Sequence, residues 1–120
     1  MSLRDLYEQY HDRVQFLVIY IREAHAIDGW DIGSEYRIHD PQSMERRREV
    51  AGQCEQTLQY GIRTYVDEMD DPVMTAYAAW PERLYLVDEM ELVVYAGGPG
   101  PDGFVPAELQ QALNRHLQAV

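Results

Sequence analysis

Apolar side chains near the start of the chain recur at intervals of three and four residues. Behind Ser2 they stand at Leu3, Leu6, Tyr7, Tyr10 and Val14. This spacing predicts an amphipathic helix that runs to about residue 12. Residues 14–21 are then apolar apart from one glutamine. Such an unbroken run predicts a buried strand that is covered on both faces.

Two Asp-Pro pairs in the middle of the chain predict the starts of two helices. Asp40-Pro41 predicts a helix cap and first helical residue, and one apolar face then continues until Gly61. The residues expected on this apolar face are Met44, Ala51, Cys54 and Leu58. The segment 64–66 predicts a short strand. Asp71-Pro72 repeats the cap signal and predicts a brief helix through about Ala79.

The last third of the chain has the pattern of a hairpin followed by a helix. The runs 84–87 and 92–96 are rich in β-branched and aromatic residues, so they predict two antiparallel strands. A glycine- and proline-rich loop, 97–103, leads to a helix that begins near Pro106. The predicted order α β α β α β β α is typical of an α/β protein with a thioredoxin-like three-layer fold, as one domain over residues 1–120. That fold has a strand before the first helix, which this sequence lacks.

Charge narrows the range of partners. Ten basic residues, all arginine, stand against 21 acidic ones and give a net charge of −11. This excludes a nucleic-acid or anionic-lipid surface, because both need clustered cations. Arg46 to Arg48 form the one basic cluster, and the glutamates on either side predict a solvated helix face. No apolar run is long enough to span a bilayer, and the first dozen residues do not resemble a signal peptide.

Two further motifs predict structure rather than chemistry. Residues 98–103 match the spelling of a dinucleotide fingerprint, but Pro99 and Pro101 remove two backbone N–H donors and Asp102 adds a negative charge. A rigid turn is therefore predicted.

Cys54 is the only cysteine. It falls within a helix without a cationic neighbour, which favours a buried structural thiol over a nucleophile, and a single cysteine suits a reducing, cytoplasmic compartment.

The strongest candidate site lies at the end of the first predicted strand. Glu23 and His25 are two residues apart and share one face of an extended chain, where ligands of open α/β sheets bind. A polar strand end without function remains the alternative. A metal site would add Asp28 or His39, without a supporting ligand pattern. Arg83 enters a neighbouring predicted strand, either as a carboxylate clamp or as a structural partner of Glu82 or Glu23.

Several blocks of this sequence, taken in order, resemble the iodothyronine deiodinase family, and most of all its bacterial deiodinase-like branch. The blocks are Phe16 to His25, Asp28 to Trp30, Ser43 to Arg47, Val66 to Met69, Ala76-Tyr77, Pro81 to Tyr85 and Gly97 to Phe104. They cover nearly the whole chain. The resemblance implies a thioredoxin-type fold and a reductive dehalogenase ancestry.

The resemblance also implies roles for single residues. Tyr20 and Glu23 match residues assigned to proton delivery, while His25 and Arg83 match the pair that holds the phenol and carboxylate ends of the hormone. His25 is thus a candidate on both the catalytic and the substrate side. A second family histidine aligns with Pro41, and His39 is the candidate substitute.

The family nucleophile, a selenocysteine or cysteine on the loop after the first strand, has no counterpart in this sequence. We therefore expect the printed chain to be inactive or nearly so, and its status as an enzyme stays open. No bound cofactor or metal is expected, only an external thiol reductant. A small phenolic, iodinated ligand and a homodimer through exposed strand edges are the expected partners. A non-catalytic binding or assembly module and a generic peroxiredoxin-like thiol reductase remain the alternatives.

Overall fold

The computed structural model describes residues 2–23, 40–58 and 61–118. Helices and strands follow one another in the order helix, strand, helix, strand, helix, strand, strand, helix, which confirms the predicted order and the α/β class. They are consistent with a thioredoxin-like fold, whose three layers stay a prediction. The chain divides into a central unit, residues 16–81, and a terminal unit, residues 1–15 with 82–120. The single domain stays a prediction as well.

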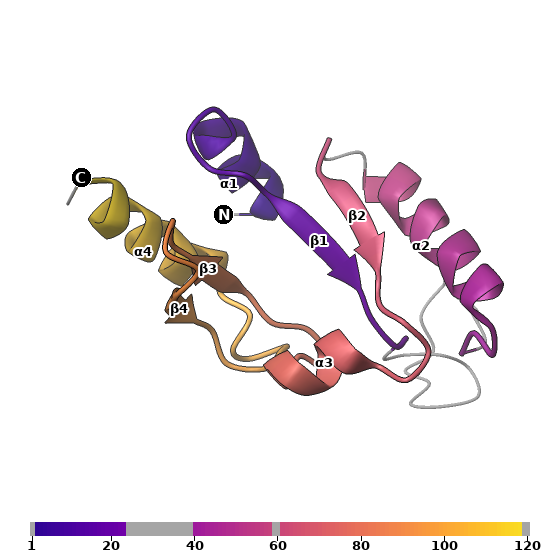
Figure 1. The fold of residues 1–120 in the computed structure, drawn as a ribbon. Helices are drawn as coiled ribbons and strands as arrows, with labels where there is room; N and C mark the ends of the chain where they lie inside the picture. Colours follow the sequence, from indigo (N-terminus) through magenta and orange to yellow (C-terminus); the bar gives the residue numbers. More distant parts are fainter. Residues whose placement is uncertain (1, 24–39, 59–60, 119–120) are drawn as a thin grey trace. The chain divides into compact units, whose positions relative to one another are not determined.

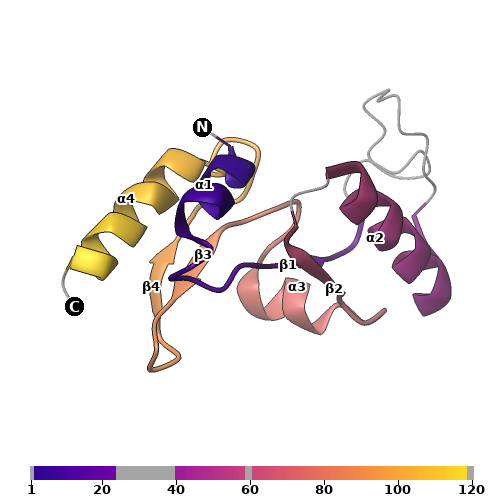
Figure 2. The same cartoon turned by 90° about the horizontal axis from the view of Figure 1, so that it is seen from above.

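The terminal unit packs two helices with a hairpin. It contains α1 (Leu3–Tyr10), β3 (Tyr85–Val87), β4 (Val93–Ala96) and α4 (Pro106–Gln118). The two strands pair antiparallel, as predicted, and α4 contacts both of them and α1 (Figure 2). Ser2 caps α1 through a reciprocal bond with Asp5, which accounts for the helix start. The buried side chains are apolar, among them Leu6, Tyr10, Leu84, Leu86, Leu109, Ala112 and Leu113.

Three backbone N–H groups of the loop from Gly97 to Gly103, those of Gly97, Gly100 and Gly103, donate to carbonyls of the protein itself. The Gly100 N–H donates to the carbonyl of Glu82 at 2.8 Å. A Cβ at Gly100 would meet the flexible side chain of Glu82, and one at Gly103 would overlap the backbone of Gly98. Gly103 therefore requires glycine because the backbone approaches so closely, in agreement with the predicted rigid turn.

The central unit is built on a pair of parallel strands. It contains β1 (Leu17–Tyr20), α2 (Met44–Leu58), β2 (Arg63–Val66) and α3 (Pro72–Tyr77). The strands lie side by side with Leu17 opposite Arg63 and Tyr20 opposite Val66, and α2 packs against β2 (Figure 1). This arrangement places the carboxyl end of β1 beside α2 and the loop that follows β2.

Two details of the central unit correct the sequence predictions. β1 is not buried on both faces, because Leu17 is 51% exposed and Ile19 37% while Val18 and Tyr20 are half-buried. An unbroken apolar run does not reveal how many faces of a strand are covered.

The start of α2 also differs from the prediction, because the helix does not begin at Asp40-Pro41. It begins at Met44, since the Ser43 hydroxyl accepts the Arg46 N–H at 3.2 Å and so serves as the cap.

Candidate functional site

Tyr20 and Glu23 form a hydrogen-bonded pair at the end of β1. The Tyr20 hydroxyl donates to Oε2 of Glu23, and the Tyr20 carbonyl accepts the Asp67 N–H at 2.9 Å. Burial of the phenol and, second, its bond to the Glu23 carboxylate raise the pKa of Tyr20 well above its usual range. The phenol therefore remains a protonated donor at neutral pH. The structure brings together the two residues that the family resemblance assigned to proton delivery.

Cys54 on α2 lies within electrostatic range of this pair. Burial, followed by the negative charge of Glu23, raises the pKa of the Cys54 thiol above its usual value. A thiol with a raised pKa is a weak nucleophile because only its thiolate attacks. The half-buried side chain thus favours the structural role predicted from its place in the helix.

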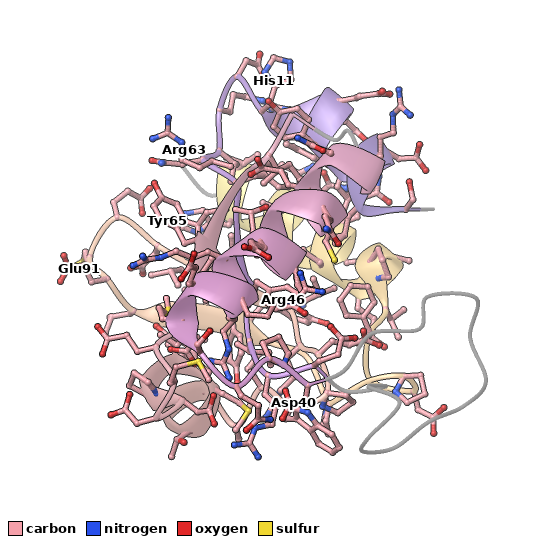
Figure 3. The ribbon with its side chains drawn as sticks, turned by 90° about the vertical axis from the view of Figure 1, so that its right-hand side faces the viewer. His11, Asp40, Arg46, Arg63, Tyr65 and Glu91 are labelled. Atoms are coloured by element: carbon pink, nitrogen blue, oxygen red, sulfur yellow. The ribbon has the colours of Figure 1, made fainter. Side chains whose placement is uncertain are left out.

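Arg47 is buried, although the sequence predicted an exposed side chain. Its side chain is 1% exposed, whereas Arg46 (Figure 3) and Arg48 are exposed as predicted. The predicted solvated face is therefore wrong at Arg47. The residue lies three positions after Met44 and four before Ala51, which places it on the apolar stripe of α2. That spacing was the signal that would have identified it.

The Arg47 guanidinium binds the loop that follows β2. Its Nη1 donates to the carbonyl of Glu68 at 2.8 Å, to that of Asp67 at 3.2 Å and to Oδ1 of Asp71 at 3.1 Å. Its buried Nε has no hydrogen-bond partner among the described residues. A buried guanidinium is tolerated only when its charge is paired, and here Asp71 supplies the opposite charge.

Asp67 and Asp71 lie in the hydrogen-bond network beside the candidate site, and the sequence did not identify them as site residues. Asp71 occupies the N-cap position of α3, as predicted, yet its side chain makes no capping bond. Asp67 caps the helix instead, since its carboxylate accepts the N–H groups of Val73 at 3.1 Å and Met74 at 2.9 Å. An Asp-Pro signal locates a helix start without showing which carboxylate caps it.

Arg83 lies in the terminal unit, just before β3. Its Nε donates to the carbonyl of Gly97 at 2.8 Å, and its guanidinium carbon stands 5.3 Å from the centroid of the Tyr85 ring. These contacts orient the side chain within its own unit. Binding of a substrate carboxylate by Arg83 stays a prediction.

The remaining candidates lie outside the described residues. His25, a candidate on both the catalytic and the substrate side, is among them, as are Asp28 and His39. Within residues 2–23, 40–58 and 61–118, no group of three or more His, Cys, Asp or Glu side chains is placed to hold a metal ion. No helix in this described part is both long and apolar enough to cross a membrane.

Comparison with known proteins assigns the chain to a family. The family model described as iodothyronine deiodinase matches residues 1–117. The chain belongs to the iodothyronine deiodinase family. Thus the pair at the end of β1 lies in a deiodinase-family chain, and the match includes the segment that holds His25.

Individual relatives agree with the family match. Proteins named thyroxine 5-deiodinase are 41% identical over 109 residues in Sparus aurata, 38% over 116 in Homo sapiens and 37% over 119 in Gallus gallus. These matches cover 90%, 96% and 96% of this chain but 40%, 38% and 44% of the relatives. The chain therefore spans about two fifths of the length of the curated relatives that it matches.

Proposed function

We propose that this chain provides the acid and substrate-binding side of a reductive dehalogenation site, with Glu23 as the proton donor. The observation that carries the proposal is the Tyr20–Glu23 pair at the end of β1 in a deiodinase-family chain. The phenol orients the carboxyl group by its hydrogen bond. Since its pKa is raised by burial and by Glu23, Tyr20 acts as a fixed donor rather than as a base.

The proposed reaction exchanges iodine for a proton at an aromatic carbon. A thiolate or selenolate attacks the iodine, the carbon–iodine bond breaks and a sulfur– or selenium–iodine bond forms. The electron pair of the broken bond remains on carbon, which takes a proton that Glu23 first accepts from solvent and then delivers. Carbon is reduced and the chalcogen is oxidised. A first external thiol then attacks the chalcogen and releases iodide, and a second thiol completes the reduction, so that the chalcogen returns to its reduced form and the two thiols become a disulfide.

The attacking atom is the part that the printed sequence does not supply at neutral pH. Its only cysteine is Cys54, whose pKa is raised by burial and by Glu23, so the thiol stays protonated. We therefore expect a polypeptide of this sequence alone to release little or no iodide. Glu23 would assist only after a thiolate or selenolate is provided.

The proposed substrate is an iodinated phenol that carries a carboxylate. The family resemblance assigns the phenol to His25 and the carboxylate to Arg83. The names of the relatives, which are thyroxine 5-deiodinases, support an iodinated aromatic substrate. An arginine side chain suits a carboxylate because its planar fork donates two parallel hydrogen bonds.

A rescue experiment tests the proposal. The purified polypeptide is mixed with an iodinated phenolic acid and a small-molecule selenol, with a dithiol as the final reductant, and iodide release is measured. We expect the wild type to accelerate release over buffer that contains the same selenol. Glu23→Gln should lower that acceleration at least about 100-fold, as loss of a general acid does.

Glu49→Gln is the matched control for this experiment. Glu49 is an exposed residue of α2 that pairs with Arg46, so the same chemical change there should leave the rescued rate intact. If the wild type gives no acceleration, or if Glu23→Gln keeps the full rate, the proposed acid role is wrong.

A non-catalytic binding module is the second candidate, and the state of Cys54 favours it. A module needs no nucleophile, and the raised pKa of Cys54 predicts slow alkylation at neutral pH. Binding of the iodinated phenolic acid that is weakened by both His25→Ala and Arg83→Ala, without rescued turnover, would support the module. Rapid alkylation of Cys54, with loss of dithiol-dependent turnover in Cys54→Ser, would instead support a peroxiredoxin-like reductase.

The finer family assignments belong to the same proposal. These are a thioredoxin-like arrangement, the bacterial branch, a cytoplasmic location and a homodimer. Among the described strands β1 pairs only with β2, and β3 only with β4, so each sheet has edges that another strand can join. A dimeric mass by light scattering at tens of micromolar is the expected result, and a monomer would contradict the dimer.

A further inference from the structure

Asp71 holds a backbone conformation that residues with a side chain rarely adopt. Its φ of 58° and ψ of 46° lie in the left-handed region, which costs a residue other than glycine roughly 1 kcal/mol or more. Such a conformation persists where the surroundings determine it strongly. Asp71 is 6% exposed, so those surroundings are protein side chains and backbone.

The Asp71 carboxylate joins two arginines from different elements. Oδ1 binds Nη1 of Arg47 on α2, and Oδ2 binds Nη2 of Arg22, two residues beyond β1, each at 3.1 Å. The carboxylate is available for this bridge because Asp67 caps α3 in its place. Asp71 therefore ties the segment that follows β1 to α2, from a position that is itself buried.

This bridge reaches the Tyr20–Glu23 pair by two routes. Arg22 is the chain neighbour of Glu23, so its bond to Asp71 restrains the backbone that carries the carboxyl group. The Asp67 N–H donates to the Tyr20 carbonyl, so the start of the same loop restrains the tyrosine. The loop 67–71 thus holds both members of the pair.

We propose that Asp71 is a positioning residue for the Tyr20–Glu23 pair, holding Glu23 in place through Arg22, while Arg47 fixes the Asp71 carboxylate. The catalytic benefit of this position rests on the proposed function. The position itself is measurable without any activity, by following the hydrogen bond between the phenol and the carboxylate.

Titration of Tyr20 in the full chain gives that measurement. Tyrosine labelled with ¹³C at Cζ reports ionisation of each phenol by NMR, and Tyr20→Phe assigns the signal. In the wild type Tyr20 should stay protonated at pH about 10, where ordinary tyrosines ionise. In Asp71→Asn it should ionise at lower pH than in the wild type.

The physical reason lies in the charges that face the phenol. Glu23 on the same segment and Cys54 on α2 raise the pKa of Tyr20, although burial is the largest cause, while Arg47 on α2 lowers it. Removing the Asp71 charge leaves Arg47 less neutralised and loosens Glu23, and both effects favour the phenolate. Asparagine also tolerates the left-handed region, so the backbone is not the variable.

Asp70→Asn is the matched control, since it removes the same charge one residue away at an exposed position. It should leave the Tyr20 titration unchanged. A wild-type titration in Asp71→Asn would overturn the proposal. If Asp71→Asn does not fold, Arg22→Gln decides instead, because the Arg22 side chain is 50% exposed. Earlier ionisation there supports the positioning role, and a wild-type titration overturns it.

The rescued dehalogenation assay separates this inference from the proposed function. Asp71→Asn should lower kcat roughly 10- to 100-fold, as misplacement of a catalytic group does, with KM unchanged. If the wild type itself shows no rescued activity, the proposed function fails while the NMR result still decides the role of Asp71. If activity is present and Asp71→Asn changes neither kcat nor the titration, only the positioning role fails.

Discussion

The two units of this chain fill their interiors differently. The buried side chains of the terminal unit are apolar, with Leu6, Leu109 and Leu113 as examples. In the central unit the buried apolar residues Val50, Ala51 and Ile62 are accompanied by Arg47, Asp67 and Asp71. Among the described residues, every buried charged side chain belongs to the central unit.

This difference means that the two interiors respond differently to substitution. Apolar burial contributes in proportion to area and tolerates many exchanges of similar volume. A buried ion pair contributes little net stability, yet removing one partner is costly because the other charge remains without compensation. The terminal unit therefore depends on volume, whereas the central unit depends on a charge network that also holds the candidate acid.

The largest expected effect comes from removing the buried cation. Arg47→Met should lower the free energy of unfolding by about 3–5 kcal/mol, since Asp71 then loses its buried partner. The half-exposed Arg22 still pairs with Asp71, which favours the lower end of that range. Urea unfolding followed by circular dichroism measures the change.

Arg48→Met is the control for charge and hydrophobicity. It makes the same substitution one residue along α2 at an exposed position, and it should change the free energy of unfolding by no more than about 0.5 kcal/mol. Equal losses in the two variants would mean that the buried network has no special weight.

A cavity in the terminal unit should come next. Leu113→Ala, at a position 2% exposed on α4, should cost about 2–5 kcal/mol through lost burial and the space left behind. Leu92→Ala, at a position 60% exposed in the β3–β4 loop, should cost less than about 0.5 kcal/mol. Similar costs at the two positions would show that this interior is not closely packed.

Much of the fold could be predicted because periodicity reports burial. The α1 and α4 stripes, the hairpin and the alternation of helices and strands all follow from apolar spacing. The covered faces of β1 could not be predicted, since an apolar run carries no information on what packs against each face. The predicted start of α2 was wrong because Ser43, three residues beyond Asp40, caps the helix instead.

The candidate site was predictable only in part. Tyr20 and Glu23 came from the family resemblance, and their hydrogen bond is present. Arg47 and Asp71 were missed because charged residues are normally solvated, and their burial depends on mutual pairing across 24 residues of sequence. The spacing of Met44 and Ala51 indicates that Arg47 is buried, but no local pattern reports a partner at that separation.

A smaller effect is expected from the helix cap of the central unit. Asp67→Asn keeps the size of the side chain but removes the charge that faces the N-terminus of α3. The free energy of unfolding should fall by about 1 kcal/mol, as loss of a helix cap does. Asp102→Asn, at an exposed loop position, should leave it unchanged. A loss that matches Arg47→Met would mean that Asp67 belongs to the ion-pair network rather than to the cap.

The smallest effect at neutral pH is expected at Tyr20, where it takes the form of a pH dependence. The folded state holds the phenol protonated because burial and Glu23 raise its pKa above the usual value of 10.0. Above that pH the unfolded chain releases a proton that the folded chain keeps, so stability is complete below about pH 10 and falls as the pH rises further. One such proton corresponds to at most about 1.4 kcal/mol per pH unit, and less here because the ring is only half-buried. Comparing urea unfolding of the wild type and Tyr20→Phe at several alkaline pH values gives this contribution, since the other tyrosines cancel in the difference, and repeating the comparison in a Cys54→Ser background removes the coupling between Cys54 and the phenol. The wild type should lose stability more steeply than Tyr20→Phe, and parallel curves would show that the pair with Glu23 does not protect the phenol.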